Sequence, residues 1–402
     1  MLNFSKTGNI TAVRTAFAAA AMALCACGAS LAQDAPALPE FPITVIGEPD
    51  PALPNIIVLD TGGTITSSAK TRISYLEYGG DNGPANGVQS IIEDLQPELT
   101  GIANLSVVNL AANDYSIGSS GGLTTKKLYV ISRTIDKFLA DPEVDGLVLT
   151  AGTNVLEEDA YFFDLTVQSP KPVVLTGSMH QYGTFTYDGA TNLFSSIRLA
   201  ANGGTACFGT VVLLNDQFFP AREVTKTDGF RMDTFDARLY GPLGVVNQNV
   251  IRVMRAPART QACGTDAWAT PFDLATITVE DLPTVDVIMT HIQASPSIIE
   301  GSVAGGAKGI VIAGHGPGGI SNFQTEARDA ALASDVVIVG TSRTGGEGLY
   351  DDGGATINAG DLQPLKARML LQLSLAFADE PSQVRDWFTT IGAAQFKPFA
   401  YE

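Results

Sequence analysis

The chain has 402 residues, 45% of them hydrophobic, which is enough for two ordinary domains with sizeable cores. Its 24 Lys and Arg residues are outnumbered by 42 Asp and Glu residues, giving a formal net charge of −18. This acidic balance argues against a nucleic acid partner, because phosphate backbones attract basic surfaces.

The N-terminal segment has the pattern of a targeting sequence. Lys6 and Arg14 precede an alanine-rich apolar run that is too short to remain as a membrane span. A small-residue cleavage site follows at Ala32, so we expect residues 1–32 to be a signal peptide. The alternative is a lipid anchor attached at Cys27. Both patterns predict a protein that is periplasmic or secreted.

Residues 33–54 are rich in proline and alanine, and we expect an extended leader without a core of its own. From Asn55 onward, short apolar strands alternate with amphipathic helices. The expected strands span residues 56–59, 105–110, 145–151, 172–175 and 208–214, and the expected helices span residues 87–99, 123–139, 156–167 and 188–201. Such βα units predict a parallel-type sheet that helices cover on both faces.

The alternation then breaks, and Pro257, Gly264 and scattered polar residues predict a connector over 255–282. A second, smaller series of strands and helices follows. Its expected strands span residues 285–290, 309–312 and 336–340, and its expected helices span residues 322–333, 362–378 and 383–391. The predicted fold class is α/β, with a larger catalytic domain at 55–254 and a smaller parallel α/β domain at 283–402.

Several expected strands of the first domain end in residues with hydroxyl, amide or carboxylate groups. Thr64 follows the first strand across two glycines, and Thr153 follows the strand at 145–151. The carboxyl ends of parallel strands share one edge, where open α/β sheets bind ligands. A threonine hydroxyl at this edge can attack a carbonyl if a neighbouring base activates it. Backbone N–H groups at Gly152 and Thr153 precede a helix and could hold a developing oxyanion.

Lys226 lies in a short polar island between apolar segments, Val224-Thr225-Lys226-Thr227. Burial there would lower the pKa of its ammonium group and make the lysine a proton acceptor. The alternative is an ordinary solvated lysine in a loop.

Several segments, in order along the chain, resemble bacterial type II L-asparaginases and the related glutaminase-asparaginases. These segments are Thr61-Gly62-Gly63-Thr64-Ile65, Ala151-Gly152-Thr153-Asn154-Val155-Leu156-Glu157-Glu158, Val224–Thr227, Tyr240–Gly244 and Lys366–Arg368. Ordered long motifs are more specific than a lone short pattern. The resemblance implies a hydrolase that cleaves the side-chain amide of L-asparagine to L-aspartate and ammonia, without metal or cofactor.

The same resemblance implies roles for individual residues. Thr64 matches the family's nucleophile, which forms an acyl-enzyme. A nearby tyrosine assists it. Tyr75 is the first candidate and Tyr78 the second, because the loop spacing differs slightly from the family pattern. Thr153 and Lys226 match the residues that orient water or relay protons.

In that family a glutamate from a neighbouring subunit completes the site, and Glu347 is the candidate here. This would make the active unit a homo-oligomer, a tetramer by resemblance. The alternative is a glutamate in an ordinary surface loop.

The residues expected to bind the amino-acid part of the substrate depart from the family pattern. Ala112-Asn113-Asp114 stands where the family has Ser-Gln-Asp, and Asn154 replaces an aspartate that faces the substrate's α-ammonium group. A lost charge-assisted contact costs about 1.5–3 kcal/mol. Free asparagine would then bind more weakly, by about one to two powers of ten. The alternative function is an amidase of the same fold that acts on a different, substituted or larger amide.

Other patterns leave further alternatives open. Cys207 and Cys263, the cysteines of the mature chain, either form a disulfide in an oxidising compartment or remain separate buried thiols. A signal peptide and two α/β domains would also suit a periplasmic binding protein, although binding needs no nucleophile. The three histidines show no metal-ligand spacing.

Overall fold

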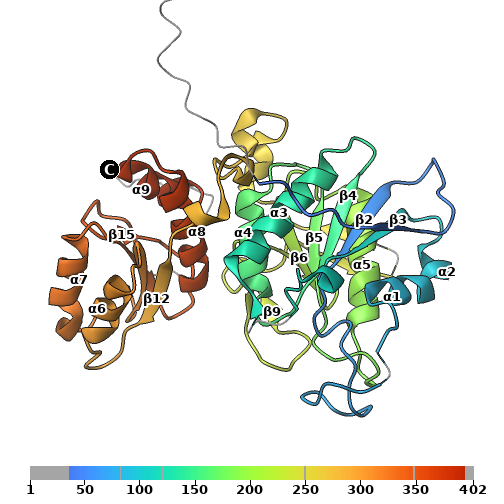
Figure 1. The fold of residues 1–402 in the computed structure, drawn as a ribbon, viewed down its shortest axis with the longest axis horizontal. Coiled ribbons are helices and arrows are strands. Elements are labelled where there is room, and N and C mark those ends of the chain that lie inside the picture. Colours follow the sequence, from blue (N-terminus) through green and yellow to red (C-terminus); the bar gives the residue numbers. More distant parts are fainter. Residues whose placement is uncertain (1–35, 82, 119–121, 249, 347–348, 394–402) are drawn as a thin grey trace, which may run out of the picture.

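The computed structural model describes residues 36–81, 83–118, 122–248, 250–346 and 349–393. Within these ranges the chain forms two α/β domains that lie side by side (Figure 1). The larger domain contains a sheet of nine strands, and the smaller domain contains a sheet of four. The expected fold class, two α/β domains of unequal size, is therefore confirmed.

The larger sheet is parallel at its centre and antiparallel at both edges. Its strand order is β1-β3-β2-β4-β5-β6-β7-β10-β11, and the pairs from β3 to β6 are parallel. Its strands are β1 Ile43–Ile46, β2 Asn55–Asp60, β3 Asn104–Asn109, β4 Gly146–Thr150, β5 Val173–Thr176, β6 Thr210–Leu214, β7 Gln217–Pro220, β10 Gly244–Asn247 and β11 Val250–Val253. Because β2 lies between β3 and β4, the chain order reverses there, and such a switch point is where open α/β sheets bind ligands.

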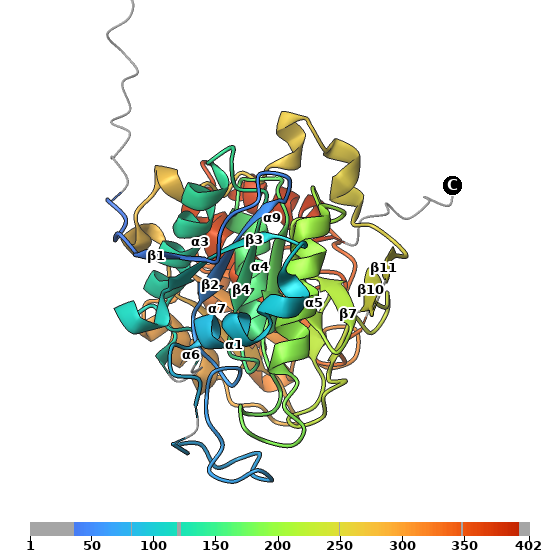
Figure 2. The ribbon, with the colours of Figure 1, turned by 90° about the vertical axis from the view of Figure 1, so that its right-hand side faces the viewer.

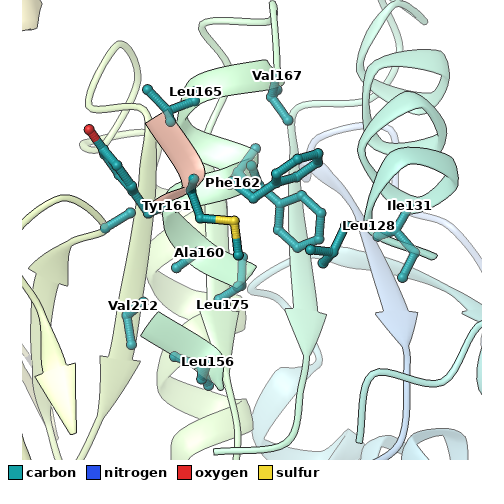
Figure 3. Packing of buried hydrophobic residues seen from close by; sticks show 14 of the residues in the cluster. Leu128, Ile131, Leu156, Ala160, Tyr161, Phe162, Leu165, Val167, Leu175 and Val212 are labelled. Carbon is teal, nitrogen blue, oxygen red and sulfur yellow. The ribbon is translucent and has the colours of Figure 1, made fainter. Parts of the chain in front are cut away.

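Helices cover both faces of this sheet because its central strands are apolar on both sides. Ile57 and Leu59 share a core with α3 and α4, whereas Ile56 and Val58 share a core with α1 and α5. Figure 3 shows side chains of α3 and α4, such as Leu128 and Phe162, in the first of these cores. Figure 2 looks onto the opposite face, with α1 and α5 toward the viewer. The helices are α1 Val88–Asp94, α2 Gln96–Leu99, α3 Thr125–Leu139, α4 Leu156–Thr166 and α5 Gly189–Asn202.

The smaller sheet is wholly parallel, with the order β12-β13-β14-β15. Side chains of α8 join the core of the larger domain, together with Val311 and Val339 of the smaller sheet. α6 and α7 share a separate core with the alternate strand residues Ile310 and Ile338. The elements of the smaller domain are β12 Val285–Met289, α6 Ser297–Ala304, β13 Gly309–Gly314, α7 Thr325–Leu332, β14 Val337–Ser342, β15 Ile357–Asn358, α8 Pro364–Phe377 and α9 Pro381–Thr390. One hydrophobic core thus spans both domains.

The connector between the domains is folded against the larger domain. Cys263 of the connector forms a disulfide with Cys207. Of the two alternatives for these cysteines, a disulfide or separate thiols, the structure contains the disulfide. Arg259 donates a hydrogen bond from Nη1 to Asp164 Oδ1 of α4 over 2.9 Å. The indole N–H of Trp268 donates to the Cys207 carbonyl oxygen, also over 2.9 Å. The connector is thereby attached to the larger domain at several points.

The structure differs from the sequence-based expectation mainly at short and edge elements. Residues 43–46, expected in an extended leader, form β1 and pair with β3. Folding therefore begins before Asn55, because a short run of β-branched residues is enough to add an edge strand. The expected helix at 87–99 is divided at Leu95, and Pro97 lies in the first turn of α2. Strands β7, β10, β11 and β15 and helix α6 add to the expected elements, as does a two-stranded sheet of β8 Thr225–Lys226 and β9 Phe235–Asp236, so Lys226 lies in a short strand.

Because Cys207 and Cys263 form a disulfide, we expect the free energy of unfolding to depend on the redox conditions. Replacing Cys207 and Cys263 together by alanine should lower the free energy of unfolding by about 2–4 kcal/mol, because the cross-link restricts the unfolded chain. Urea denaturation measures the difference. A reductant should lower the midpoint of the wild type and leave that of the double variant unchanged. Equal midpoints for the oxidised wild type and the double variant would contradict this prediction.

Candidate active site

The first strand of the site, β2, ends in a tightly held turn. Asp60, its last residue, is only 2% exposed. Its carboxylate accepts hydrogen bonds from the backbone N–H groups of Gly62 and Val88, each over 2.9 Å. Burial raises the pKa of this carboxyl group, and the two N–H contacts partly oppose the rise. These contacts hold the turn that carries Thr64 past the end of the strand.

Close contact between loop backbones brings the loops of Thr64 and Thr153 together. Gly63 has a φ of +103°, and a Cβ atom on it would lie 3.0 Å from the backbone carbonyl group of Ala151. A Cβ atom on Gly118 would lie 2.1 Å from the backbone nitrogen of Gly63. Larger side chains at these positions would push apart the loops that follow β2, β3 and β4. The three loops therefore meet at the switch point of the sheet.

A tyrosine hydroxyl lies beside the hydroxyl group of Thr64. Thr64 Oγ1 is 3.1 Å from the hydroxyl oxygen of Tyr78. Tyr75, the first candidate for this role, is directed elsewhere. Its ring stacks on His180 with 4.4 Å between the ring centroids, and its hydroxyl oxygen lies 3.5 Å from Thr186 Oγ1. The structure thus brings the second candidate, Tyr78, to Thr64 and places Tyr75 against His180.

Thr153 and Lys226 form a second pair. The Lys226 ammonium group donates to Thr153 Oγ1 over 2.9 Å and to Asn154 Oδ1 over 3.1 Å. The backbone N–H of Lys226 donates over 3.3 Å to Glu157 Oε1, in the first turn of α4. Burial lowers the pKa of Lys226, against the opposing effects of Asp228 and Glu157. The neutral, proton-accepting form of the lysine is therefore easier to reach than in water.

The turn after β3 holds the residues expected to bind the amino-acid part of the substrate. Ala112 and Asn113 lie in a 3-10 turn, and Asp114 follows with a φ of 65°. The side-chain nitrogen of Asn113 donates over 2.9 Å to the carbonyl oxygen of Asn109, the last residue of β3. The carboxylate of Asp114 is exposed and accepts no hydrogen bond from the described residues. The turn therefore offers few polar groups that are both fixed and available.

A buried lysine of the smaller domain supports the segment that holds Lys226. Lys366 of α8 has no exposed surface, and its ammonium group donates to the backbone carbonyl oxygens of Ala221 and Val224. Burial lowers the pKa of Lys366 to about 8. Sequence reasoning noted this lysine only as part of the motif Lys366–Arg368, without assigning it a contact. Its role as a bridge between the domains depends on tertiary structure.

Two kinds of feature do not occur in the part of the chain that the structure describes. No group of three or more His, Cys, Asp or Glu residues could hold a metal ion there. No helix in those same ranges is long and apolar enough to cross a lipid bilayer. Glu347, the candidate glutamate of the site, lies outside the described residues, as do residues 1–32.

Comparisons with known proteins bear on both domains. The family model "Asparaginase, N-terminal" matches residues 55–259, and the model "Glutaminase/Asparaginase C-terminal domain" matches residues 284–388. L-asparaginase 2 of Bacillus subtilis (strain 168) is 34% identical over 349 residues, which cover 84% of this chain and 86% of that protein. L-asparaginase 2 of Escherichia coli (strain K12) is 36% identical over 346 residues, which cover 84% of this chain and 93% of that protein.

A solved structure shares the fold. The crystal structure of the probable cytoplasmic L-asparaginase from Campylobacter jejuni superimposes with a TM-score of 0.74 at 28% sequence identity. The match covers 84% of this chain and 99% of that chain. Together with the two family models, these similarities show that the chain belongs to the asparaginase family and is a hydrolase that acts on amide C–N bonds.

Proposed function

We propose that this protein hydrolyses the side-chain amide of L-asparagine to L-aspartate and ammonia, with Thr64 as the nucleophile. The observation that carries the proposal is that two threonine hydroxyl groups each lie next to a proton-transfer group. Thr64 Oγ1 is 3.1 Å from the hydroxyl oxygen of Tyr78, and Thr153 Oγ1 is 2.9 Å from Lys226 Nζ. A nucleophile next to a proton-transfer group is the arrangement that acyl transfer requires. The relatives named L-asparaginase support asparagine as the substrate.

In the first step, Thr64 Oγ1 forms a bond to the amide carbon, and the bond from this carbon to the amide nitrogen breaks. The proton of the Thr64 hydroxyl passes through the hydroxyl of Tyr78 to the departing nitrogen, which leaves as ammonia. The backbone N–H groups of Thr153 and Asn154, before α4, donate to no described residue and are suited to stabilise the negative charge that develops on the carbonyl oxygen, whereas the N–H of Gly152 already donates to the carbonyl oxygen of Ile117 over 3.3 Å. The product of this step is an ester between Thr64 and the acyl group.

In the second step, water attacks the carbon of the ester. Neutral Lys226 accepts a proton from the water through the hydroxyl of Thr153, and the bond between Thr64 Oγ1 and the acyl carbon breaks. Thr64 regains a proton from this pair, and the carboxylic acid leaves. The lowered pKa of Lys226 supports its role as the proton acceptor, because a base must be neutral when it acts.

A second candidate function is an amidase of the same fold that acts on a different or larger amide. The turn after β3 favours it, because Ala112 offers no hydroxyl group and the side-chain nitrogen of Asn113 already donates to Asn109. The chemistry at Thr64 would be the same. Ammonia release from asparagine, glutamine and simple amides, compared at equal concentrations, distinguishes the two candidates.

We further propose that the chain is exported and acts as a homo-oligomer. The pattern of residues 1–32 and the disulfide support export, since disulfides persist in oxidising compartments. The family resemblance supports assembly, with Glu347 as the residue that a neighbouring subunit would supply. Cell fractionation and light scattering test these two proposals, and a cytoplasmic or monomeric protein would contradict them.

The nucleophile is tested by removing its hydroxyl group. Thr64→Ala should lower kcat for ammonia release by about three powers of ten or more, because no ester can form. Thr66→Ala is the matched control, since it removes a threonine hydroxyl from the same loop and should change kcat only a few-fold. Near-normal ammonia release by Thr64→Ala, with an unchanged melting temperature, would overturn the assignment.

The two tyrosines are tested in parallel. Tyr78→Phe should lower kcat by about 10²–10⁴-fold, because the hydroxyl group that relays the Thr64 proton is lost. Tyr75→Phe should leave kcat within a few-fold of the wild type, since its hydroxyl lies against Thr186. Steady-state kinetics on the two variants decide the matter, and the reverse pattern would assign the role to Tyr75.

A further inference from the structure

The side-chain amide of Asn154 has a defined orientation. A lysine ammonium group has donors but no acceptor, so the Asn154 atom that lies 3.1 Å from Lys226 Nζ must be the amide oxygen. The contact of Lys226 with Thr153 over 2.9 Å fixes the position of the ammonium group. The amide nitrogen of Asn154 is left to face other partners, and no described residue accepts a hydrogen bond from it. Position 154 therefore offers an incoming group two N–H donors and no negative charge.

The neighbouring residues do not restore the missing charge at this position. Ala112 has no polar side-chain atom, and the side-chain nitrogen of Asn113 is held by Asn109. Asp114 is the acidic residue of that turn, but it is exposed, and exposed ion pairs contribute only about 0–1 kcal/mol. In its protonated form, Lys226 adds a cation next to the amide oxygen of Asn154. An ammonium group at position 154 would thus meet donors and a like charge.

An acylated nitrogen suits the same position. Its carbonyl oxygen is an acceptor for the free N–H donors of Asn154, and the nitrogen carries no charge to be repelled by Lys226. Asn154 is itself exposed, so a chain that extends from the acyl group can pass into solvent. Both the hydrogen-bonding groups and the space at position 154 therefore fit a substituted α-nitrogen.

We propose that Asn154 selects substrates whose α-nitrogen is acylated, so that N-acylasparagines and C-terminal asparagine residues of peptides are hydrolysed in preference to free L-asparagine. The proposal rests on the proposed function, because Thr64 attacks the same side-chain amide in both kinds of substrate. The side chain at position 154 would then discriminate between acylated substrates and free L-asparagine.

The test compares kcat/KM for L-asparagine, Nα-acetyl-L-asparagine and succinamic acid, which has the same side-chain amide but no α-nitrogen. The wild type should prefer the acetylated substrate to free asparagine by about tenfold or more. Asn154→Asp should shift this ratio toward asparagine by about 10–100-fold, the effect of one charge-assisted hydrogen bond. Asn247→Asp, the same change at an exposed position of β10, is the matched control and should leave the ratio unchanged.

Each outcome separates this proposal from the proposed function. Hydrolysis of asparagine in preference to the acetylated substrate, with a ratio that Asn154→Asp does not move, would overturn the selection by Asn154 and leave the amide hydrolysis standing. Loss of the asparagine preference in Asp114→Asn would then assign the ammonium contact to Asp114. Release of ammonia from none of the three compounds by a folded protein would overturn the proposed function, and this selection with it.

Discussion

Close contact between loop backbones is the constraint on which the candidate active site depends. A Cβ atom at position 152 would lie 2.4 Å from the carbonyl oxygen of Gly118, and one at position 118 would lie 2.1 Å from the nitrogen of Gly63. The strand order lets the three loops leave the sheet at adjacent points, and the glycines allow them to touch. Backbone packing, rather than flexible side chains, thus brings together the loops that carry Thr64 and Thr153. Such fixed placement is what converts a weak nucleophile into an effective one.

The smaller domain supports this arrangement although the described catalytic candidates all belong to the larger one. Lys366 extends from α8 to the carbonyl oxygens of Ala221 and Val224, in the segment that leads to Lys226. A buried ammonium group is costly unless acceptors and opposite charges surround it. Glu157 acts on both lysines, favouring the charged form of Lys226 and of Lys366. The position of Lys226, the proposed proton acceptor, therefore depends on the contact between the domains.

The features that could be predicted from the sequence are those with a local cause. β2 and β4 are buried on both faces, so their apolar runs are uninterrupted and easily recognised. Edge strand β1 and the hairpin of β10 and β11 have exposed residues and no such run. The choice between Tyr75 and Tyr78 depends on the path of an irregular loop, which residue spacing does not determine.

Tertiary distance decided the alternatives for the two cysteines and brought Thr153 and Lys226 together. The Cα atoms of Cys207 and Cys263 lie 5.7 Å apart although 56 positions separate them in the chain, and residue spacing contains no such information. The partnership of Thr153 with Lys226 was expected only because both residues match motifs of one family, and the structure places them 2.9 Å apart. Resemblance thus identified the pair proposed to transfer protons, while the contact of Lys226 with Asn154 became visible only in three dimensions.

The carboxamide at position 154 acts on Lys226, the proposed base, as well as on the proposed substrate. A carboxylate only 3.1 Å from the Lys226 ammonium group would favour the charged lysine and raise its pKa. A carboxamide accepts the same hydrogen bond without adding a negative charge. The carboxylates that do act on Lys226, those of Asp228 and Glu157, raise its pKa less than burial lowers it. The carboxamide that leaves a substrate ammonium group without a counter-charge therefore also makes neutral Lys226 more accessible, so the proposed substrate recognition and the proposed proton transfer are coupled through one side chain.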